Sequence, residues 1–168
     1  DMPTKENPPF KFLVEQTDAV CQPVHYLEAD EGKKPEEGTA LCLSGGGYRA
    51  MLFHAGVLWR LNEVGWLPKI NRISSVSGGS ITAGVLAMNW HRLDFENSIG
   101  TKFEDEIITP IRNLASHTID QYAVLKGAVW FGTVGDKIAN YYRKYLFGKT
   151  TLQDITDEPR FVFNATNL

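Results

Sequence analysis

Apolar and polar residues follow two patterns along this chain, short apolar runs and longer runs with helical spacing. Thr39 to Ser44, Ile70 to Val76 and Arg160 to Thr166 are short apolar runs, which predict buried strands. Tyr48 to Val64 lies between the first two and repeats its apolar residues every three or four positions, which predicts a helix. Those positions are Met51, Leu52, Ala55, Leu58 and Leu61. A strand, a helix and a second strand in succession predict an α/β fold with a parallel sheet and right-handed crossovers.

Three further segments have helical patterns, and glycine and proline mark their ends. The segments are Ser80 to His91, Phe103 to Ile119 with a break at Pro110, and Val134 to Phe147 followed by Gly148. Gly65 fits the C-terminal cap of the first helix, and Pro68 lies just beyond it. Tyr122 to Phe131 is apolar and aromatic, and its Trp130 and Phe131 fit a lipid-facing surface, a hinge or ordinary packing within a helical cap.

The first 38 residues differ from the rest, because they are rich in proline and charge. Lys11 to Val20 has the composition of a short helix, and Glu28 to Glu37 is a solvated linker without periodicity. We therefore expect an N-terminal extension and linker over residues 1–38 and a globular domain over residues 39–168.

The composition is that of a globular protein and excludes several classes. The 168 residues are 43% hydrophobic and 22% charged, which suffices for one domain with a core. The net charge of -3 argues against a nucleic-acid-binding protein, which would carry a basic stripe. No apolar run is long enough for a transmembrane helix, and no secretory signal peptide is visible. The chain opens on Asp1 rather than methionine, so an upstream leader stays open.

The two cysteines indicate a reducing compartment. Cys21 and Cys42 lie in separate segments and make no disulfide framework, and we expect Cys42 to be a core residue of the first strand. His25, His91 and His117 are scattered, without the spacing of metal ligands. We expect a cytoplasmic protein without metal or cofactor, and peripheral attachment to a membrane surface stays open.

A glycine-rich turn, Gly45 to Ala50, follows the first strand and opens the first helix. It fits the loose dinucleotide motif G-x-G-x-x-A, but residues 64–93 contain no acidic residue to hold a ribose. A phosphate-binding P-loop is excluded because no Lys-Ser or Lys-Thr follows. The alternative is an oxyanion hole, in which the N–H groups of Gly45, Gly46 and Gly47 and the helix dipole stabilise negative charge. Arg49 would support this loop or hold negative charge, or it simply pairs on the surface.

A serine turn follows the second strand, with the sequence Ser75-Val76-Ser77-Gly78-Gly79. It approximates the nucleophile elbow G-x-S-x-G, with Ser75 in place of the first glycine. Ser77 would stand at the tip of the turn, at the N-terminus of the next helix, whose dipole stabilises a developing alkoxide. We expect Ser80, the competing serine, to be a helix cap. Together, the two turns offer a nucleophile and a cradle for an oxyanion, which acyl transfer requires.

In combination, these motifs resemble the patatin-like phospholipase family. The likeness rests on Ser44 to Ala50, on His54-Ala55-Gly56-Val57-Leu58, on Ser75 to Ser80 and on the closing Phe161 to Leu168. It runs from about Thr39 to Leu168. The chain departs mildly from the family at Ala50 and Ser75, where the family often has glycine.

The resemblance implies a three-layer α/β sandwich with a mainly parallel central sheet, and a lipid acyl hydrolase of the phospholipase A or lysophospholipase type. It implies a Ser-Asp dyad with Ser77 as nucleophile, Gly45, Gly46, Gly47 and Gly78 at the oxyanion hole, and Arg49 in support. It implies membrane phospholipid or another acyl lipid as substrate. It implies no catalytic histidine, and His54 in the first helix fits a core residue better than a base.

One departure from the family pattern concerns the base. The family's aspartate stands in an Asp-Gly motif, and this chain contains no Asp-Gly. We therefore expect the N-terminal part of a catalytic domain, incomplete at its C-terminus, whose aspartate comes from a C-terminal half or second chain, and which alone is inactive. The alternative is a non-catalytic lipid- or partner-binding half-domain that acts only in assembly. Asp94, Asp120, Asp136, Asp154 and Asp157 match no motif of the family.

Overall fold

The computed structural model describes residues 37–116 and 134–165. The chain forms two units, Asp1–Glu37 and Gly38–Leu168, and nearly all described residues belong to the second. The helix expected at Lys11 to Val20 and the aromatic run at Tyr122 to Phe131 lie outside the described residues, as does nearly all of the linker.

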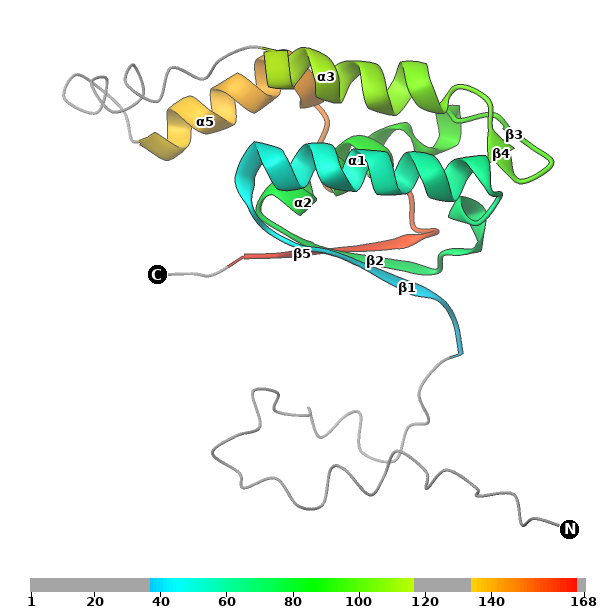
Figure 1. The fold of residues 1–168 in the computed structure, drawn as a ribbon. Coiled ribbons are helices and arrows are strands. Elements are labelled where there is room, and N and C mark those ends of the chain that lie inside the picture. The colour runs from blue at the N-terminus through cyan, green and yellow to red at the C-terminus, as the bar shows by residue number, and fades with distance from the viewer. Residues whose placement is uncertain (1–36, 117–133, 166–168) are drawn as a thin grey trace, which may run out of the picture. The chain divides into compact units, whose positions relative to one another are not determined.

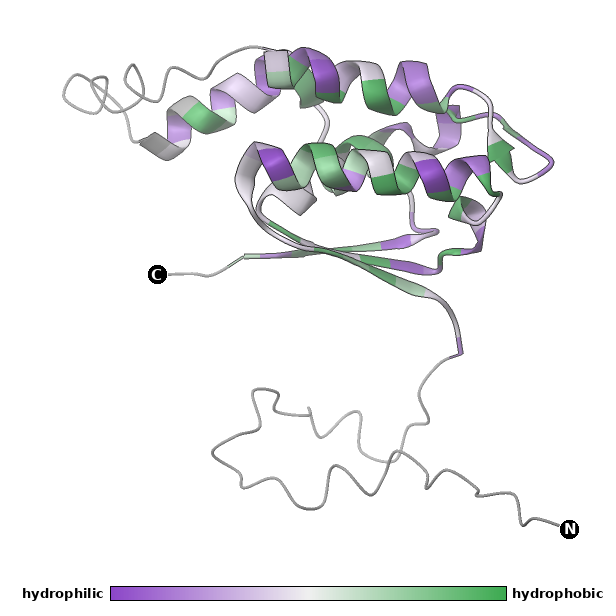
Figure 2. Ribbon diagram, viewed as in Figure 1, coloured by the Kyte–Doolittle hydropathy of each residue, from purple (hydrophilic) through white to green (hydrophobic). Residues whose placement is uncertain are grey.

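Three parallel strands form the sheet of the second unit, in the spatial order β1-β2-β5. They are β1 (Ala40–Leu43), β2 (Arg72–Val76) and β5 (Arg160–Asn164). The prediction of a parallel α/β sheet is confirmed. Figure 2 shows that the strands are hydrophobic in their middle, and Arg72 and Arg160 lie side by side in register at the amino ends of β2 and β5.

The helices lie on one face of this sheet (Figure 1). They are α1 (Gly47–Glu63), α2 (Gly78–Asn89), α3 (Thr109–Ser116) and α5 (Val134–Tyr142). Two short 3₁₀ turns follow these first two helices, η4 (Leu67–Lys69) after α1 and η5 (Trp90–Arg92) after α2. A small hairpin of β3 (Phe95–Glu96) and β4 (Ile99–Gly100), which the sequence pattern did not predict, follows η5. The predicted helices that fall within the described residues are confirmed to within a few residues, and the predicted end at Ile119 lies outside those residues.

The core fills the space between the sheet and the helices. Alternation along each strand turns one set of side chains toward the helices, so that Leu43 and Ile73 are buried there. α1 contributes a stripe at helical spacing, and α2 is apolar nearly all round because other elements surround it. The core residues of these two helices and of the following helical segments are Met51, Ala55, Leu58, Ile81, Ala83, Val85, Leu86, Phe103, Ile107, Ile108, Ile111 and Leu114.

The opposite face of the sheet is exposed among the described residues. Cys42, Ser74 and Val162 stand in one row of the sheet, and Val162 is 41% exposed. Cys42 is exposed as well, so its prediction as a core residue is wrong. The apolar run around Cys42 suggested a strand buried on both faces, but the described helices cover only the face that carries Leu41 and Leu43. The second helical layer of a three-layer sandwich is not among the described residues.

Two π-helical turns interrupt the later helices. η6 (Glu104–Ile108) leads into α3, and η8 (Arg143–Phe147) continues α5 to Gly148, whose φ of 56° ends it as expected. The predicted break at Pro110 takes the form of a junction, because Pro110 is the second residue of α3, directly after η6. Proline lacks an N–H group, so it gives no hydrogen bond to the Glu106 carbonyl four residues earlier, and the Asn89 amide donates to that carbonyl at 3.1 Å instead.

The C-terminal end of α1 is fixed by a glycine and a buried asparagine. Gly65 has a φ of 67°, and Trp66 N–H donates to the Leu61 carbonyl at 2.8 Å, which confirms the predicted cap. Asn62 is 4% exposed and joins α1 to the hairpin, because its amide donates to the Gly100 carbonyl at 3.0 Å and accepts from Gly100 N–H at 2.7 Å. This end of α1 lies opposite the glycine turn.

Candidate active site

The two predicted turns meet at the carboxyl edge of the parallel sheet. The glycine turn connects β1 to α1, and the serine turn connects β2 to α2. Because β1 and β2 are parallel neighbours, the N-termini of α1 and α2 come together at this edge. The first N–H groups of each helix lack intrahelical acceptors, and the helix dipoles add partial positive charge. The edge therefore suits a group that is, or becomes, negatively charged.

Ser77 stands at a strained position between strand and helix. Its φ of 53° and ψ of -121° lie where residues other than glycine are rare. The residue is exposed and occupies the N-cap position of α2, yet its side chain makes no capping hydrogen bond. The strained backbone thus places a hydroxyl that does not cap the helix at the tip of a strand-to-helix turn, as the predicted nucleophile elbow requires.

The glycine turn packs directly against the serine turn. A Cβ atom added to Gly45 would lie 3.3 Å from Ser77 Cβ and 3.9 Å from Ser77 Oγ. A Cβ on Gly78 would collide with the carbonyl oxygen of Gly47, and one on Gly79 would lie 2.5 Å from that of Leu43. Only glycine lets the two backbones approach so closely. The structure therefore brings Gly45, Gly47, Ser77 and Gly78 together.

Gly46 and Arg49 lie at the start of α1 with less contact to the serine. Gly46 is the N-cap residue with a φ of 136°, and a Cβ atom added to it would meet the Ala50 side chain. Gly47 follows with a φ of 63°, and a Cβ there would meet no atom within 4 Å. Arg49 is exposed, and it makes no hydrogen bond or ion pair within residues 37–116 and 134–165. Its guanidinium group faces solvent rather than bracing the turn.

A small network of hydroxyl groups supports the serine turn from below. Ser75 is 2% exposed, and its hydroxyl donates to the Val162 carbonyl at 3.4 Å and accepts from Ser80 Oγ at 3.2 Å. The serine in place of the usual glycine is thus accommodated, because its buried hydroxyl has partners. The expectation that Ser80 caps α2 is wrong. Ser77 occupies the cap position, and Ser80 lies inside the helix, where its hydroxyl holds Ser75.

Asn164 ties the end of β5 to the serine turn, a role that the sequence pattern did not reveal. Its amide nitrogen donates to Ser74 Oγ at 2.9 Å and to the Ser75 carbonyl at 3.1 Å. Asn164 pairs in register with Val76, the residue before Ser77. The third strand therefore restrains the backbone that leads into the turn.

Two side chains of α1 connect the glycine turn to the interior. His54 is 5% exposed, and its Nε2 atom lies 3.0 Å from the Ser44 carbonyl oxygen and 3.2 Å from Ser44 Oγ. The Tyr48 hydroxyl is buried, and burial together with Tyr141 and Tyr142 raises the pKa of this phenol far above its ordinary value. Tyr48 therefore stays neutral at physiological pH. The expectation that His54 is a hydrogen-bonded core residue is confirmed.

Two aspartates, Asp94 and Asp157, lie far from Ser77. Asp94 follows the C-terminal end of α2, and α2 has 12 residues and so spans about 18 Å from its start beside Ser77. Its carboxylate forms an ion pair with Lys102. Asp157 precedes β5 and so lies at the amino edge of the sheet. The five residues of β5 span roughly 16 Å from this edge to the carboxyl edge, where Ser77 lies.

Two further aspartates have other contacts, and one lies outside the described residues. Asp154 also precedes β5, and hydrogen bonds from the Thr151 hydroxyl at 2.7 Å and N–H at 2.8 Å hold the pKa of its carboxyl below the ordinary value. Asp136 lies in the first turn of α5. Asp120 lies outside the described residues.

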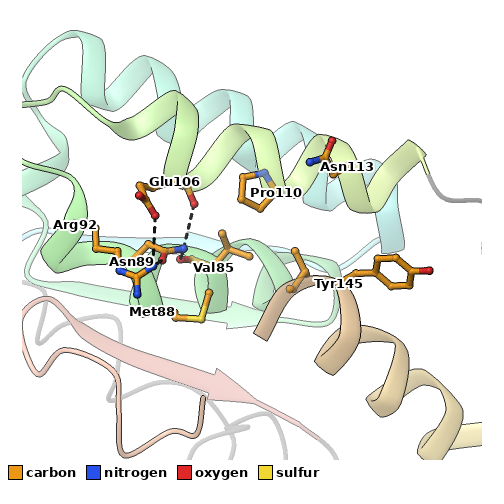
Figure 3. Close-up of a pocket in the computed structure, with 9 residues that line it drawn as sticks. Val85, Met88, Asn89, Arg92, Glu106, Pro110, Asn113 and Tyr145 are labelled. Carbon is orange, nitrogen blue, oxygen red and sulfur yellow. Dashed lines mark hydrogen bonds and ion pairs between the residues drawn. The ribbon is translucent and has the colours of Figure 1, made fainter. Parts of the chain in front are cut away.

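A cavity of about 350 Å³ opens between α2, α3 and the two π-helical turns (Figure 3). Its polar groups pair with one another. Asn89 donates to the carbonyls of Val85 and Glu106 at 3.1 Å each, and Arg92 lies 3.8 Å from the Glu106 carboxylate. These contacts join the C-terminal half of α2 to η6. The cavity therefore lies where these helices pack together, at the end of α2 that is far from the serine turn.

The part of the chain that the structure describes has neither a metal site nor a membrane-spanning helix. No group of histidine, cysteine, aspartate or glutamate there has the geometry to hold a metal ion. None of the helices there combines the length and the apolar character that crossing a bilayer demands.

The family model described as patatin-like phospholipase matches residues 41–166. The match covers most of the chain and includes the glycine turn, the serine turn and the three strands that hold them. It confirms the family that the motifs suggested. No curated protein and no solved structure matches the chain.

Proposed function

Because the chain belongs to the patatin-like phospholipase family, whose members act on lipids, we propose that it is a lipid acyl hydrolase with Ser77 as its nucleophile. The observation that carries the proposal is the positive φ of Ser77 at a turn that packs against Gly45 and Gly47. Strain of this kind persists where the surrounding structure enforces it, and it clusters at active sites. The substrate would be the acyl ester of a membrane phospholipid or a related lipid.

In the proposed mechanism, Ser77 Oγ attacks the carbonyl carbon of the ester while a base takes its proton. The N–H groups of Gly45, Gly46, Gly47 and Gly78 stabilise the oxyanion of the tetrahedral intermediate. The intermediate collapses when the base returns the proton to the departing alcohol, which leaves an acyl-serine ester. Water, deprotonated by the same base, then attacks this ester and releases the fatty acid and the free serine.

We assign the base to an aspartate outside these 168 residues. Asp94, Asp154 and Asp157 lie at the wrong ends of α2 and β5, and the family's Asp-Gly motif does not occur in the sequence. His54 does not fill the role, because its Nε2 atom already faces the Ser44 carbonyl. Arg49 is exposed at the start of α1 and would meet a negatively charged headgroup or the developing oxyanion.

Covalent labelling tests the nucleophile directly. A fluorophosphonate probe should react with the active protein at Ser77, because the turn exposes this hydroxyl beside unpaired N–H groups. Peptide mapping should place the adduct on Ser77, and prior incubation with a phospholipid substrate should slow the labelling. An adduct on Ser44 or Ser80 would contradict the assignment.

Substitution of Gly47 tests the oxyanion hole. Gly47→Ala should lower kcat by roughly 100-fold, equivalent to about 3 kcal/mol, because alanine disfavours the φ of 63° and so shifts the N–H donors at the start of α1. Its cost in folding free energy should be only about 1–2 kcal/mol, the penalty of a left-handed backbone. Steady-state kinetics and thermal unfolding measure the two effects.

Gly65→Ala is the matched control for this substitution. Gly65 has a φ of 67°, close to the 63° of Gly47, and lies at the opposite end of α1. It should lose a similar amount of stability and keep its activity. Equal activity in both variants would show that the glycine turn does not contribute to catalysis.

A further inference from the structure

His54 lies beneath the glycine turn as a buried polar group that the proposed mechanism does not use. It projects from the second turn of α1, with only 5% of its surface exposed, and the Phe53 ring packs edge-on against it at 5.4 Å. Its Nε2 atom is 3.0 Å from the carbonyl oxygen of Ser44, the residue directly before the three glycines.

The partner of Nε2 determines where the imidazole carries its proton. A carbonyl oxygen can only accept a hydrogen bond, and the carbonyl contact at 3.0 Å is the shorter of the two that Nε2 makes, so we assign the proton to Nε2. Ser44 Oγ, at 3.2 Å, lies beside the same N–H group. His54 is therefore a donor at this atom, and the histidine holds the backbone of the turn rather than removing a proton.

Holding the Ser44 carbonyl also fixes the next N–H group. A trans peptide is planar, with its C=O and N–H pointing in opposite directions. The Ser44–Gly45 peptide therefore turns its N–H away from His54 once its carbonyl is bound to Nε2. Gly45 is also the glycine whose added Cβ would lie 3.3 Å from Ser77 Cβ. One hydrogen bond thus restrains the peptide of the glycine that packs against the serine side chain.

We propose that His54 is a positioning residue, whose Nε2–H holds the Ser44 carbonyl and so aims the Gly45 N–H as an oxyanion donor. This inference rests on the proposed function of Ser77. It differs from a packing role, because a side chain of similar volume without a donor would fill the space and still leave the peptide free to rotate. The free rotation would weaken the transition state more than the substrate complex, because the oxyanion exists only in the former.

Three variants of the active protein separate positioning from packing. His54→Leu removes the donor, and His54→Gln restores an N–H near the place of Nε2. Asn62→Leu is the control, because Asn62 is equally buried on the same helix and its two hydrogen bonds to Gly100 lie at the far end of α1. All three should lower the melting temperature, so activity is measured well below it.

The kinetic constants for an acyl ester should then distinguish the variants. His54→Leu should lower kcat by roughly 10- to 100-fold and leave KM within about twofold, as expected for a misplaced oxyanion donor. His54→Gln should recover most of that loss, and Asn62→Leu should keep the wild-type kcat. An unchanged kcat in His54→Leu, or an equal loss in the leucine and glutamine variants, would overturn the inference.

A spectroscopic measurement tests the donor independently of turnover. Two-bond ¹H–¹⁵N correlations of the neutral imidazole should show the proton of His54 on Nε2. A proton on Nδ1 alone would overturn the inference even in a fully active enzyme. Conversely, an Nε2–H tautomer in a protein without Ser77-dependent hydrolysis would leave the His54–Ser44 contact in place and refute the proposed function and the oxyanion role with it.

Discussion

Replacing Ser77 with alanine is expected to lower kcat for acyl-ester hydrolysis by about 10⁴-fold or more. In the proposed mechanism, the substitution removes the attacking oxygen and leaves the oxyanion donors in place. Alanine keeps the Cβ atom, so the strained turn and its contact with Gly45 persist. Substrate binding should therefore survive, and hydrolysis of a nitrophenyl ester and of a phospholipid measures the loss.

Ser77→Gly adds a second arm to the same experiment. Glycine adopts a φ of 53° without penalty, so this variant should be inactive and yet more stable than the wild type by about 1–2 kcal/mol. Such a gain is the expected sign of strain that serves function. Denaturant unfolding of the alanine and glycine variants measures the difference.

Ser80→Ala controls for the loss of any hydroxyl near the turn. The Ser80 hydroxyl acts through Ser75, so its removal should cost less than about tenfold in kcat, the range expected for one modest hydrogen bond. An active Ser77→Ala variant, or a Ser80→Ala variant with the larger loss, would move the nucleophile to another residue.

The sequence predicted the two turns and their neighbourhood because the relevant features are local. Backbone contacts require glycine at Gly78 and Gly79, and positive φ values favour it at Gly46 and Gly47. A strand before each turn and a helix after it follow from hydrophobic periodicity. Parallel pairing of β1 and β2 then has to place both turns at one edge of the sheet.

The supporting contacts could not be predicted, because they join residues that are far apart in the chain. Ser75 bonds to the Val162 carbonyl and Asn164 to Ser74, across almost ninety positions of sequence. The wrong assignment of Ser80 as a cap has the same origin, since the hydroxyl has a choice of partners that only the packed structure decides. The only local sign of the His54 contact was a polar residue in the apolar stripe of α1.

The exposed face of the sheet explains why the prediction of Cys42 as a core residue is wrong. A run of apolar residues is typical of strands covered on both sides, and the described helices cover one side only. Val76 and Val162 remain 43% and 41% exposed on the other face. Exposed neighbouring apolar side chains on a sheet are typical of surfaces that another segment covers. We expect the segment that carries the proposed aspartate to cover this face of the sheet.

In the proposed mechanism, Ser77 needs a base from outside residues 1–168. Residues 1–168 alone should hydrolyse acyl esters at least about 10³-fold more slowly than the same chain supplied with an aspartate-bearing segment, because a serine hydroxyl without a base is a weak nucleophile at neutral pH. The segment should also cover the exposed sheet face and improve solubility. Purified chain, with and without a co-expressed C-terminal segment that contains Asp-Gly, is assayed with a nitrophenyl ester and a phospholipid.

The controls identify the source of any activity. In the supplied segment, an Asp→Asn change should abolish the gain in hydrolysis and keep the gain in solubility, because the amide has the same shape and cannot accept the proton. Ser77-dependent turnover by residues 1–168 alone would place the base within the chain. Asp120, Asp136 and His54 would then be the first residues to test, since Asp94, Asp154 and Asp157 lie at the far ends of α2 and β5. A complex that is soluble, binds phospholipid and stays inactive would instead favour the non-catalytic binding module.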